Sequence, residues 1–169
     1  TGYSSAGSQL DAAAYKAIVD SIAKQSVSVS SYDNFLPQSF LATGESNFAF
    51  KSTVNFGVSA ALAGVWEIRS GVDFGKGGAI FVDGVAKDFK TNDMWWAGSY
   101  SNPTQYFDVS LNLAAGNHVL QIYGLEGCCS GAHQAQFKAS GGAGFTSFSS
   151  NDGLIAAVPE PETYAMLMA

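Results

Sequence analysis

The two cysteines of the chain, Cys128 and Cys129, are neighbours in the stretch GLEGCCSG. Such a pair can stay as free thiols, form bridges to other chains, or close one bond between the two neighbours. The last state is strained, because adjacent Cα atoms lie only ~3.8 Å apart, below the usual disulfide range. Gly127 and Gly131 flank the pair and tolerate unusual backbone angles. We therefore predict a Cys128–Cys129 disulfide in an oxidising compartment.

This bond has three candidate uses. It closes almost no loop, so it constrains the unfolded chain little. It can lock a turn, present a flat apolar plate to a ligand such as a sugar ring, or act as a redox switch, since strained bonds are more readily reduced. A metal site is not favoured, because adjacent sulfurs cannot both sit well on one tetrahedral ion. The supporting ligands would be limited to His118, His133 and Glu126.

Three aromatic residues, Trp95, Trp96 and Tyr100, lie close together in the sequence. Neighbouring residues on a strand point to opposite faces, so one tryptophan is expected to be buried and the other exposed. The cluster predicts either packing in the core and at its rim, or a stacking surface for carbohydrate or a neighbouring protein.

Carboxylates suggest a second kind of site. Asp73 and Asp83 bracket the stretch FGKGGAIFV, and jelly-roll domains often hold a structural calcium ion in loops that supply carboxylates and carbonyls. Calcium at these two residues is one hypothesis, and solvated turn residues are the other. No other cofactor is expected.

No catalytic constellation stands out. The chain has two histidines, neither lies in a nucleophile motif, and no paired-carboxylate pattern is visible. We therefore expect that the protein is not an enzyme. A polysaccharide hydrolase with two carboxylates on separate strands stays open as an alternative.

The composition is that of an extracellular β-protein. Hydrophobic residues make up 47% and charged residues 13%, and glycine occurs 19 times. The net charge is −6, with 8 Lys and Arg residues. Phosphate binding needs clustered basic side chains, so a nucleic-acid partner is not expected. No stretch reaches the ~20 apolar residues of a membrane span.

One helix is predicted near the N-terminus, from the stretch SQLDAAAYKAIVDSIAK at 8–24 within a helical segment 1–25. Ser8 and Asp11 have the spacing of a capping box. A narrow apolar stripe recurs every four residues, and it predicts docking on the chain's own domain or on a second copy. The stripe consists of Leu10, Ala14, Ile18 and Ile22.

From residue 26 the hydrophobic period changes to two, which is typical of strands. SVSVSSY, NFAFKSTVNF and VWEIRSGVDF alternate, and two apolar runs meet at Asp83 and Gly84, a hairpin signal. The stretch 105–124 carries a similar hairpin signal around its Ala-Gly-Asn turn. Seven to nine strands without an intervening helix predict a mainly β fold. We expect an antiparallel, jelly-roll-like β-sandwich over 26–145, then a linker and extended tail over 146–169.

The chain ends AAVPEPETYAMLMA. Pro159 and Pro161 disfavour helix and ladder hydrogen bonds, so residues 157–162 should form an extended spacer. The stretch VPEP before an apolar run resembles the start of a PEP-CTERM sorting tail, although the remainder of that family's membrane helix and its basic cluster are missing. The stretch CCSG at 128–131 resembles the motif of the family's Cys-Cys-x-Gly subgroup. The sorting motif comprises Val158, Pro159, Glu160 and Pro161.

The resemblance implies a location rather than a reaction. Proteins of this family are exported by Gram-negative bacteria, enter the membrane transiently through the tail, are processed by an exosortase, and are linked with surface polysaccharide. It therefore implies a protein that is extracellular or at the cell surface.

Two functions follow as hypotheses. The first is a secreted, non-enzymatic surface or matrix protein, the self-assembling subunit of an extracellular filament, in which an apolar tail adds to a sheet edge of the next copy. The tail residues concerned are Tyr164, Met166, Leu167 and Met168. The alternative is a carbohydrate-binding module that uses the tryptophans and the disulfide, with polysaccharide as its partner.

Overall fold

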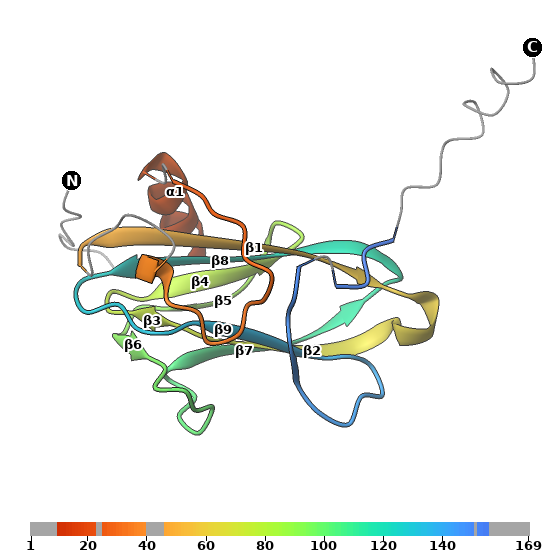
Figure 1. Ribbon diagram of the computed structural model, residues 1–169. Coiled ribbons are helices and arrows are strands. Elements are labelled where there is room, and N and C mark those ends of the chain that lie inside the picture. The colour runs from red at the N-terminus through yellow and green to blue at the C-terminus, as the bar shows by residue number, and fades with distance from the viewer. Residues whose placement is uncertain (1–9, 23–24, 40–45, 151, 156–169) are drawn as a thin grey trace, which may run out of the picture.

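The computed structural model describes residues 10–22, 25–39, 46–150 and 152–155. Within them it has one α-helix, α1 (Ala12–Ile22), two short 3-10 turns (Pro37–Ser39 and Ala60–Leu62) and ten strands. The strands are β1 (Phe48–Val58), β2 (Gly64–Gly71), β3 (Asp73–Phe74), β4 (Gly78–Val82), β5 (Val85–Lys90), β6 (Met94–Trp95), β7 (Tyr106–Leu113), β8 (Gly116–Glu126), β9 (Gln134–Lys138) and β10 (Thr146–Ser147). Figure 1 shows a mainly β sandwich with α1 on one outer face, which confirms the predicted fold class.

Two four-stranded sheets form the sandwich. Sheet 1 has the order β1-β8-β4-β5, and sheet 2 has the order β10-β9-β2-β7. Every strand pairing in them is antiparallel. A short ribbon of β3 and β6 lies at one end of the sandwich (Figure 1).

The core between the sheets is rich in aromatic rings. Alternate residues of each strand face inward, so β1 contributes Phe56 and β2 contributes Trp66. Trp66 stacks on Phe137 at a centroid distance of 5.2 Å, and Phe148 lies 4.7 Å from Phe137 and 5.2 Å from Phe56. These contacts join the two sheets across the interior.

Helix α1 docks on the outer face of sheet 1. Asp11 caps it by accepting a hydrogen bond from the Ala14 N–H at 2.8 Å, which is the N-cap role of aspartate. Ala12, Tyr15 and Val19 form its buried face and pack in a second apolar cluster. The sheet side of that cluster consists of Ala79, Phe81, Tyr123 and Leu125.

The predicted apolar stripe of the helix lies beside that buried face. Leu10, Ala14, Ile18 and Ile22 are all half-buried, and Leu10 and Ile18 pack at the border of the second cluster. The helix therefore docks on its own domain through a face that adjoins the predicted stripe. Whether the flank also meets a second copy stays a prediction.

One predicted hairpin is confirmed and one is wrong. β4 and β5 pair through Val82 and Val85, and both turn residues have positive φ, 51° at Asp83 and 75° at Gly84, as a two-residue hairpin turn requires. β7 and β8, in contrast, belong to opposite sheets. Their turn signal marks a chain reversal, but both strands carry an apolar face, so they pack face to face instead of pairing.

Residues 25–30 form an extended strap and not the predicted strand. The strap passes from the α1 side across β1 toward sheet 2 (Figure 1), and two isolated bridges then follow, Ser31 with Ser149 and Phe35 with His133. At the other end of the chain, β10 pairs with β9, and Phe148 is fully buried. The sandwich thus continues beyond residue 145, where the linker was predicted to begin.

Among the described residues, no helix has the length and apolar character needed to cross a bilayer. The sorting motif at 158–161 and the tail residues 164–168 lie outside the described part of the chain. Processing and tail-mediated assembly therefore stay predictions.

Candidate functional site

The predicted disulfide is present. Cys128 and Cys129 are bonded, with Cα atoms 3.7 Å apart, and both residues are exposed. Cys129 has a φ of 70°, a left-handed conformation that side-chain-bearing residues seldom adopt. We use "disulfide end" for the loop 127–132 that carries this bond together with the adjoining β3–β6 ribbon.

Two buried carboxylates hold the disulfide loop. Glu126 accepts hydrogen bonds from the Cys128 N–H at 2.8 Å and from the Gly75 N–H at 3.1 Å. Asp73 lies against Gly131, where an added Cβ would come within 2.5 Å of the Asp73 Oδ2 atom. Only glycine fits that approach. The loop is thus held near its start by Glu126 of β8, and near its end it lies against Asp73 of β3.

Burial sets the protonation of these carboxylates. It raises the pKa of Asp73 to about 6, with a further increase from the nearby Glu126 charge and an opposing effect of the Gly131 N–H. Burial also raises the pKa of Glu126, and the N–H groups of Gly75 and Cys128 oppose that rise. The pair therefore holds one proton more readily than two ordinary surface carboxylates would.

The structure separates the two neighbouring tryptophans, as predicted. The Trp95 side chain is 66% exposed, whereas Trp96 is 4% exposed. Trp96 covers Gly71, where an added Cβ would lie 2.2 Å from the indole ring, and its ring is 5.3 Å from that of Tyr100. Tyr100 is itself covered by the Arg69 guanidinium at 3.8 Å. Trp95 is thus the member of the predicted cluster that is available for stacking.

Trp95 belongs to the disulfide end. It sits on β6 directly opposite Asp73 on β3, and Asp73 in turn contacts Gly131 of the disulfide loop. Residues directly opposite in an antiparallel pair have Cα atoms about 4.5–5.5 Å apart. The exposed indole and the exposed disulfide are therefore two apolar features on one end of the sandwich.

The two aspartates of the calcium hypothesis do not meet. Asp73 precedes β4 and Asp83 follows it, so the strand separates them. The Asp83 carboxylate is engaged by the His118 Nδ1 atom at 2.7 Å and by the Val119 N–H at 2.9 Å. Within the described residues, no three His, Cys, Asp or Glu side chains are grouped so that they could hold a metal ion. One ion shared by Asp73 and Asp83 is not compatible with this arrangement, and calcium at either residue alone stays a prediction.

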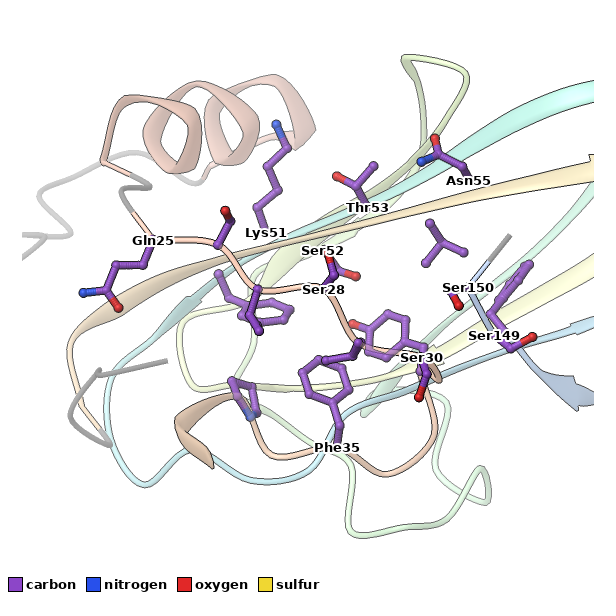
Figure 2. A pocket seen from close by; sticks show the side chains of 18 residues that line it. Gln25, Ser28, Ser30, Phe35, Lys51, Ser52, Thr53, Asn55, Ser149 and Ser150 are labelled. Carbon is purple, nitrogen blue, oxygen red and sulfur yellow. The ribbon is translucent and has the colours of Figure 1, made fainter. Parts of the chain in front are cut away.

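A concave region, which the sequence did not reveal, lies along β1. We call it the β1 groove: a cavity of about 620 Å³ between the strap, β1 and residues 148–150. Figure 2 shows seryl, threonyl and asparaginyl side chains on its walls and aromatic rings below them. The alternating SVSVS of the strap indicates extended backbone, and the sequence therefore predicted a strand of the sheet. In the structure this extended segment forms one wall of the groove instead.

The comparisons with known proteins concern the fold. No family model matches the chain, and no curated protein matches it. A PA14 sugar-binding domain from an RTX adhesin superposes with a TM-score of 0.58 and 17% identity, covering 90% of this chain and 94% of that one. A family 35 carbohydrate-binding module from an environmental isolate gives a TM-score of 0.34 and 17% identity, over 60% of this chain and 70% of that one. The first likeness shows a shared fold, and the second is too low to carry an argument.

Proposed function

We propose that this protein is a non-catalytic domain that binds carbohydrate outside the cell. The observation that carries the proposal is the exposed Trp95 indole on the disulfide end. Sugar rings present apolar C–H faces that stack on tryptophan, and a stacking residue contributes most when its backbone is held rigidly. The β3–β6 ribbon and the anchored loop supply that rigidity.

The chemistry of the disulfide end supports binding rather than hydrolysis. Glu126 uses both carboxylate oxygens to accept backbone N–H groups, and Asp73 is buried against the disulfide loop. Their described contacts position the loop, and neither is aimed at open space. An exposed disulfide also suits an oxidising, extracellular location, and the fold is one that a sugar-binding domain of an adhesin shares.

The experiment is a binding assay with one matched pair of variants. Wild-type protein is mixed with a panel of soluble and insoluble bacterial and plant polysaccharides, and affinity is measured by pull-down and calorimetry. Trp95→Ala should weaken binding about tenfold or more, as expected for a central aromatic contact. Phe89→Ala is the control, because Phe89 is also an exposed aromatic residue, at 47%, but belongs to β5 of sheet 1 and not to the β3–β6 ribbon.

The outcomes are distinct. Loss of binding in Trp95→Ala with retention in Phe89→Ala supports the proposal. Absence of binding to every polysaccharide, or equal binding by wild type and Trp95→Ala, contradicts it. Self-assembly is tested separately, by comparing fibre formation of the full chain and of a chain that lacks residues 158–169.

A further inference from the structure

The β1 groove contains an unpaired strand edge. Among the described residues, β1 is an outer strand of sheet 1 and pairs with β8 alone. The Asp83 N–H donates to the Val119 carbonyl, and the Lys76 N–H donates to the Leu125 carbonyl, so odd-numbered residues of β8 turn their peptide groups toward β4. Even-numbered residues of β8 therefore bond to β1.

The register of β1 against β8 then gives the direction in which each peptide group of β1 points. Val54 lies opposite Leu120, so even-numbered residues of β1 bond to β8 and odd-numbered residues point away from the sheet. The Gly57 N–H confirms this direction, since it donates outward to the Asp152 carbonyl at 2.7 Å. The N–H and C=O groups of Lys51, Thr53 and Asn55 consequently face the groove, and no described backbone group bonds to them.

The strap leaves those groups open. Its first backbone hydrogen bond to the remainder of the described chain is at Ser30, whose carbonyl accepts from the Ser150 N–H at 2.9 Å. Residues 25–29 form no such bond with the described residues, and most of them are exposed. Three peptide groups of β1 therefore have no backbone partner in the described part of the chain and are open to water or to a ligand.

The lining of the groove defines the chemistry of that ligand. The described lining contains no carboxylate, and its one charged residue is Lys51, whose ammonium group is turned to Asp20 at 2.8 Å. Figure 2 shows the Lys51 side chain directed toward the helix. The walls carry neutral groups that both donate and accept hydrogen bonds, namely Ser28, Ser30, Thr53 and Asn55.

We propose that the β1 groove binds a segment of a neutral, extended polysaccharide. Its hydroxyl groups pair with the open peptide groups of β1 and with the seryl hydroxyls of the strap, while its C–H faces lie over the apolar floor. The volume of about 620 Å³ is within the range of small-ligand sites. This inference rests on the proposed function and adds to it a second contact region and a ligand class.

A peptide strand fits the groove less well. Strand addition uses a continuous edge, but the strap crosses this one (Figure 2), and Asp152 already occupies the position at Gly57. The part of the open edge that lines the groove is 51–55. An added strand would also bond only to alternate residues, and this run offers it three such positions before Asp152 closes the edge at Gly57. A thin hydroxyl-rich polymer can use three separate peptide groups without a longer edge.

The test uses amide exchange and chemical shifts measured by NMR on the full chain. The probes are a linear hexasaccharide of glucose and a hexamer of galacturonic acid, which has similar length but one carboxylate per ring. Without sugar, the amides of Lys51, Thr53 and Asn55 should exchange rapidly, while those of Ser52 and Val54 are protected by the sheet. The neutral hexasaccharide should slow exchange at the three odd-numbered positions about tenfold or more and leave the even-numbered positions unchanged.

A matched pair of double variants checks the contact by calorimetry. Thr53→Val with Asn55→Ala should weaken binding of the neutral hexasaccharide about tenfold, because two polar partners are lost. Ser110→Ala with Asn112→Ala is the control, since these residues are exposed on β7, in the other sheet. Equal affinities of the two double variants would overturn the inference.

Other outcomes separate this inference from the proposed function. If sugar shifts the Trp95 indole signal but none of the three odd-numbered amides, the groove inference is wrong and the proposed function stands. If no carbohydrate shifts either region, both are wrong. If the acidic hexamer slows exchange of the three odd-numbered amides as much as the neutral hexasaccharide does, the inference that the ligand is neutral is wrong. Protection that grows with protein concentration in the absence of sugar would mean that a second copy occupies the edge, which also overturns the inference.

Discussion

His133 is a histidine held without charge in the core. Its side chain is fully buried, and its ring lies 4.8 Å from that of Phe50, 5.1 Å from Phe74 and 5.8 Å from Phe35. Burial lowers the pKa of His133 from 6.5 to about 3, and the backbone of Asp73 acts in the opposite direction. The informative perturbation is His133→Phe, which keeps an aromatic ring of similar size and removes the titration.

The sign and size of the effect follow from proton linkage. Between pH 6.5 and about 3 the unfolded chain protonates His133 and the folded protein does not, so stability is lost as the pH falls through this window. The loss is about 1.4 kcal/mol per pH unit and about 5 kcal/mol in total. A domain of this kind has a free energy of unfolding of about 5–15 kcal/mol, so this residue should contribute strongly to acid unfolding.

The assay is urea denaturation, followed by circular dichroism, at several pH values from 8 to 4. Above pH 7 the variant should differ from wild type by a constant amount of about 1–2 kcal/mol or less. Below pH 6 the variant should gain stability relative to wild type by about 1.4 kcal/mol per pH unit. Asp73 titrates in the same range, but it is present in both proteins and cancels in the difference.

His118→Gln provides the control with the opposite sign. Partial burial lowers the pKa of His118, but its bonds to Asp83 and to the Ala114 carbonyl outweigh this, and the pKa is raised. Its contribution to stability is present below pH 6.5 and lost as the pH rises through the raised value. A difference between His133→Phe and wild type that stays flat from pH 7 to pH 4 would refute the reasoning about His133.

Three further predictions concern the disulfide end and the tryptophans. The pKa of Asp73 is raised from 3.8 to about 6, so the charged carboxylate destabilises the folded protein above that range. Asp73→Asn should therefore raise the free energy of unfolding by about 1–3 kcal/mol at pH 8 and by almost nothing at pH 3.5. Urea titrations at both pH values check this. Mass spectrometry of unreduced protein should show a monomer in which neither Cys128 nor Cys129 is alkylated, and reduction should change stability by less than about 1 kcal/mol, because the closed loop is minimal. Trp95→Ala should leave the free energy of unfolding within about 0.5 kcal/mol of wild type, whereas Trp66→Ala, at a site 2% exposed, should cost about 3–5 kcal/mol by the same measurement.

Several parts of the candidate site were predictable because they depend on neighbours in the chain. Adjacent cysteines can bond wherever the backbone between them adapts, and flanking glycines signal that it can. Two neighbouring tryptophans on a strand must point to opposite faces, so one exposed ring was expected. The sequence could not tell which ring it would be. Trp96 is buried because Gly71 of a distant strand leaves room for it, and that pairing is a tertiary contact.

By itself the sequence determined the elements that short-range physics controls. The Asp83 and Gly84 turn follows from the positive φ that these residues tolerate, the helix from its periodicity, and the sandwich class from the period of two. The predicted capping box placed the N-cap at Ser8, whereas the structure has Asp11 in that position. Tertiary structure alone decided which strands pair. β7 and β8 carry a hairpin-like signal but enter opposite sheets, since a turn signal reports that the chain reverses and not which edge accepts the next strand.

The same distinction explains the β1 groove and the separation of the two aspartates. An alternating stretch such as SVSVS becomes a strand only where a partner edge lies at hydrogen-bonding distance, and the strap instead crosses β1 with a cavity between them. Asp73 and Asp83 are close in sequence, but an extended strand of five residues spans about 17 Å and places them at opposite ends. Hydrogen bonds, cavities and metal sites depend on distances between segments, which local sequence patterns do not contain.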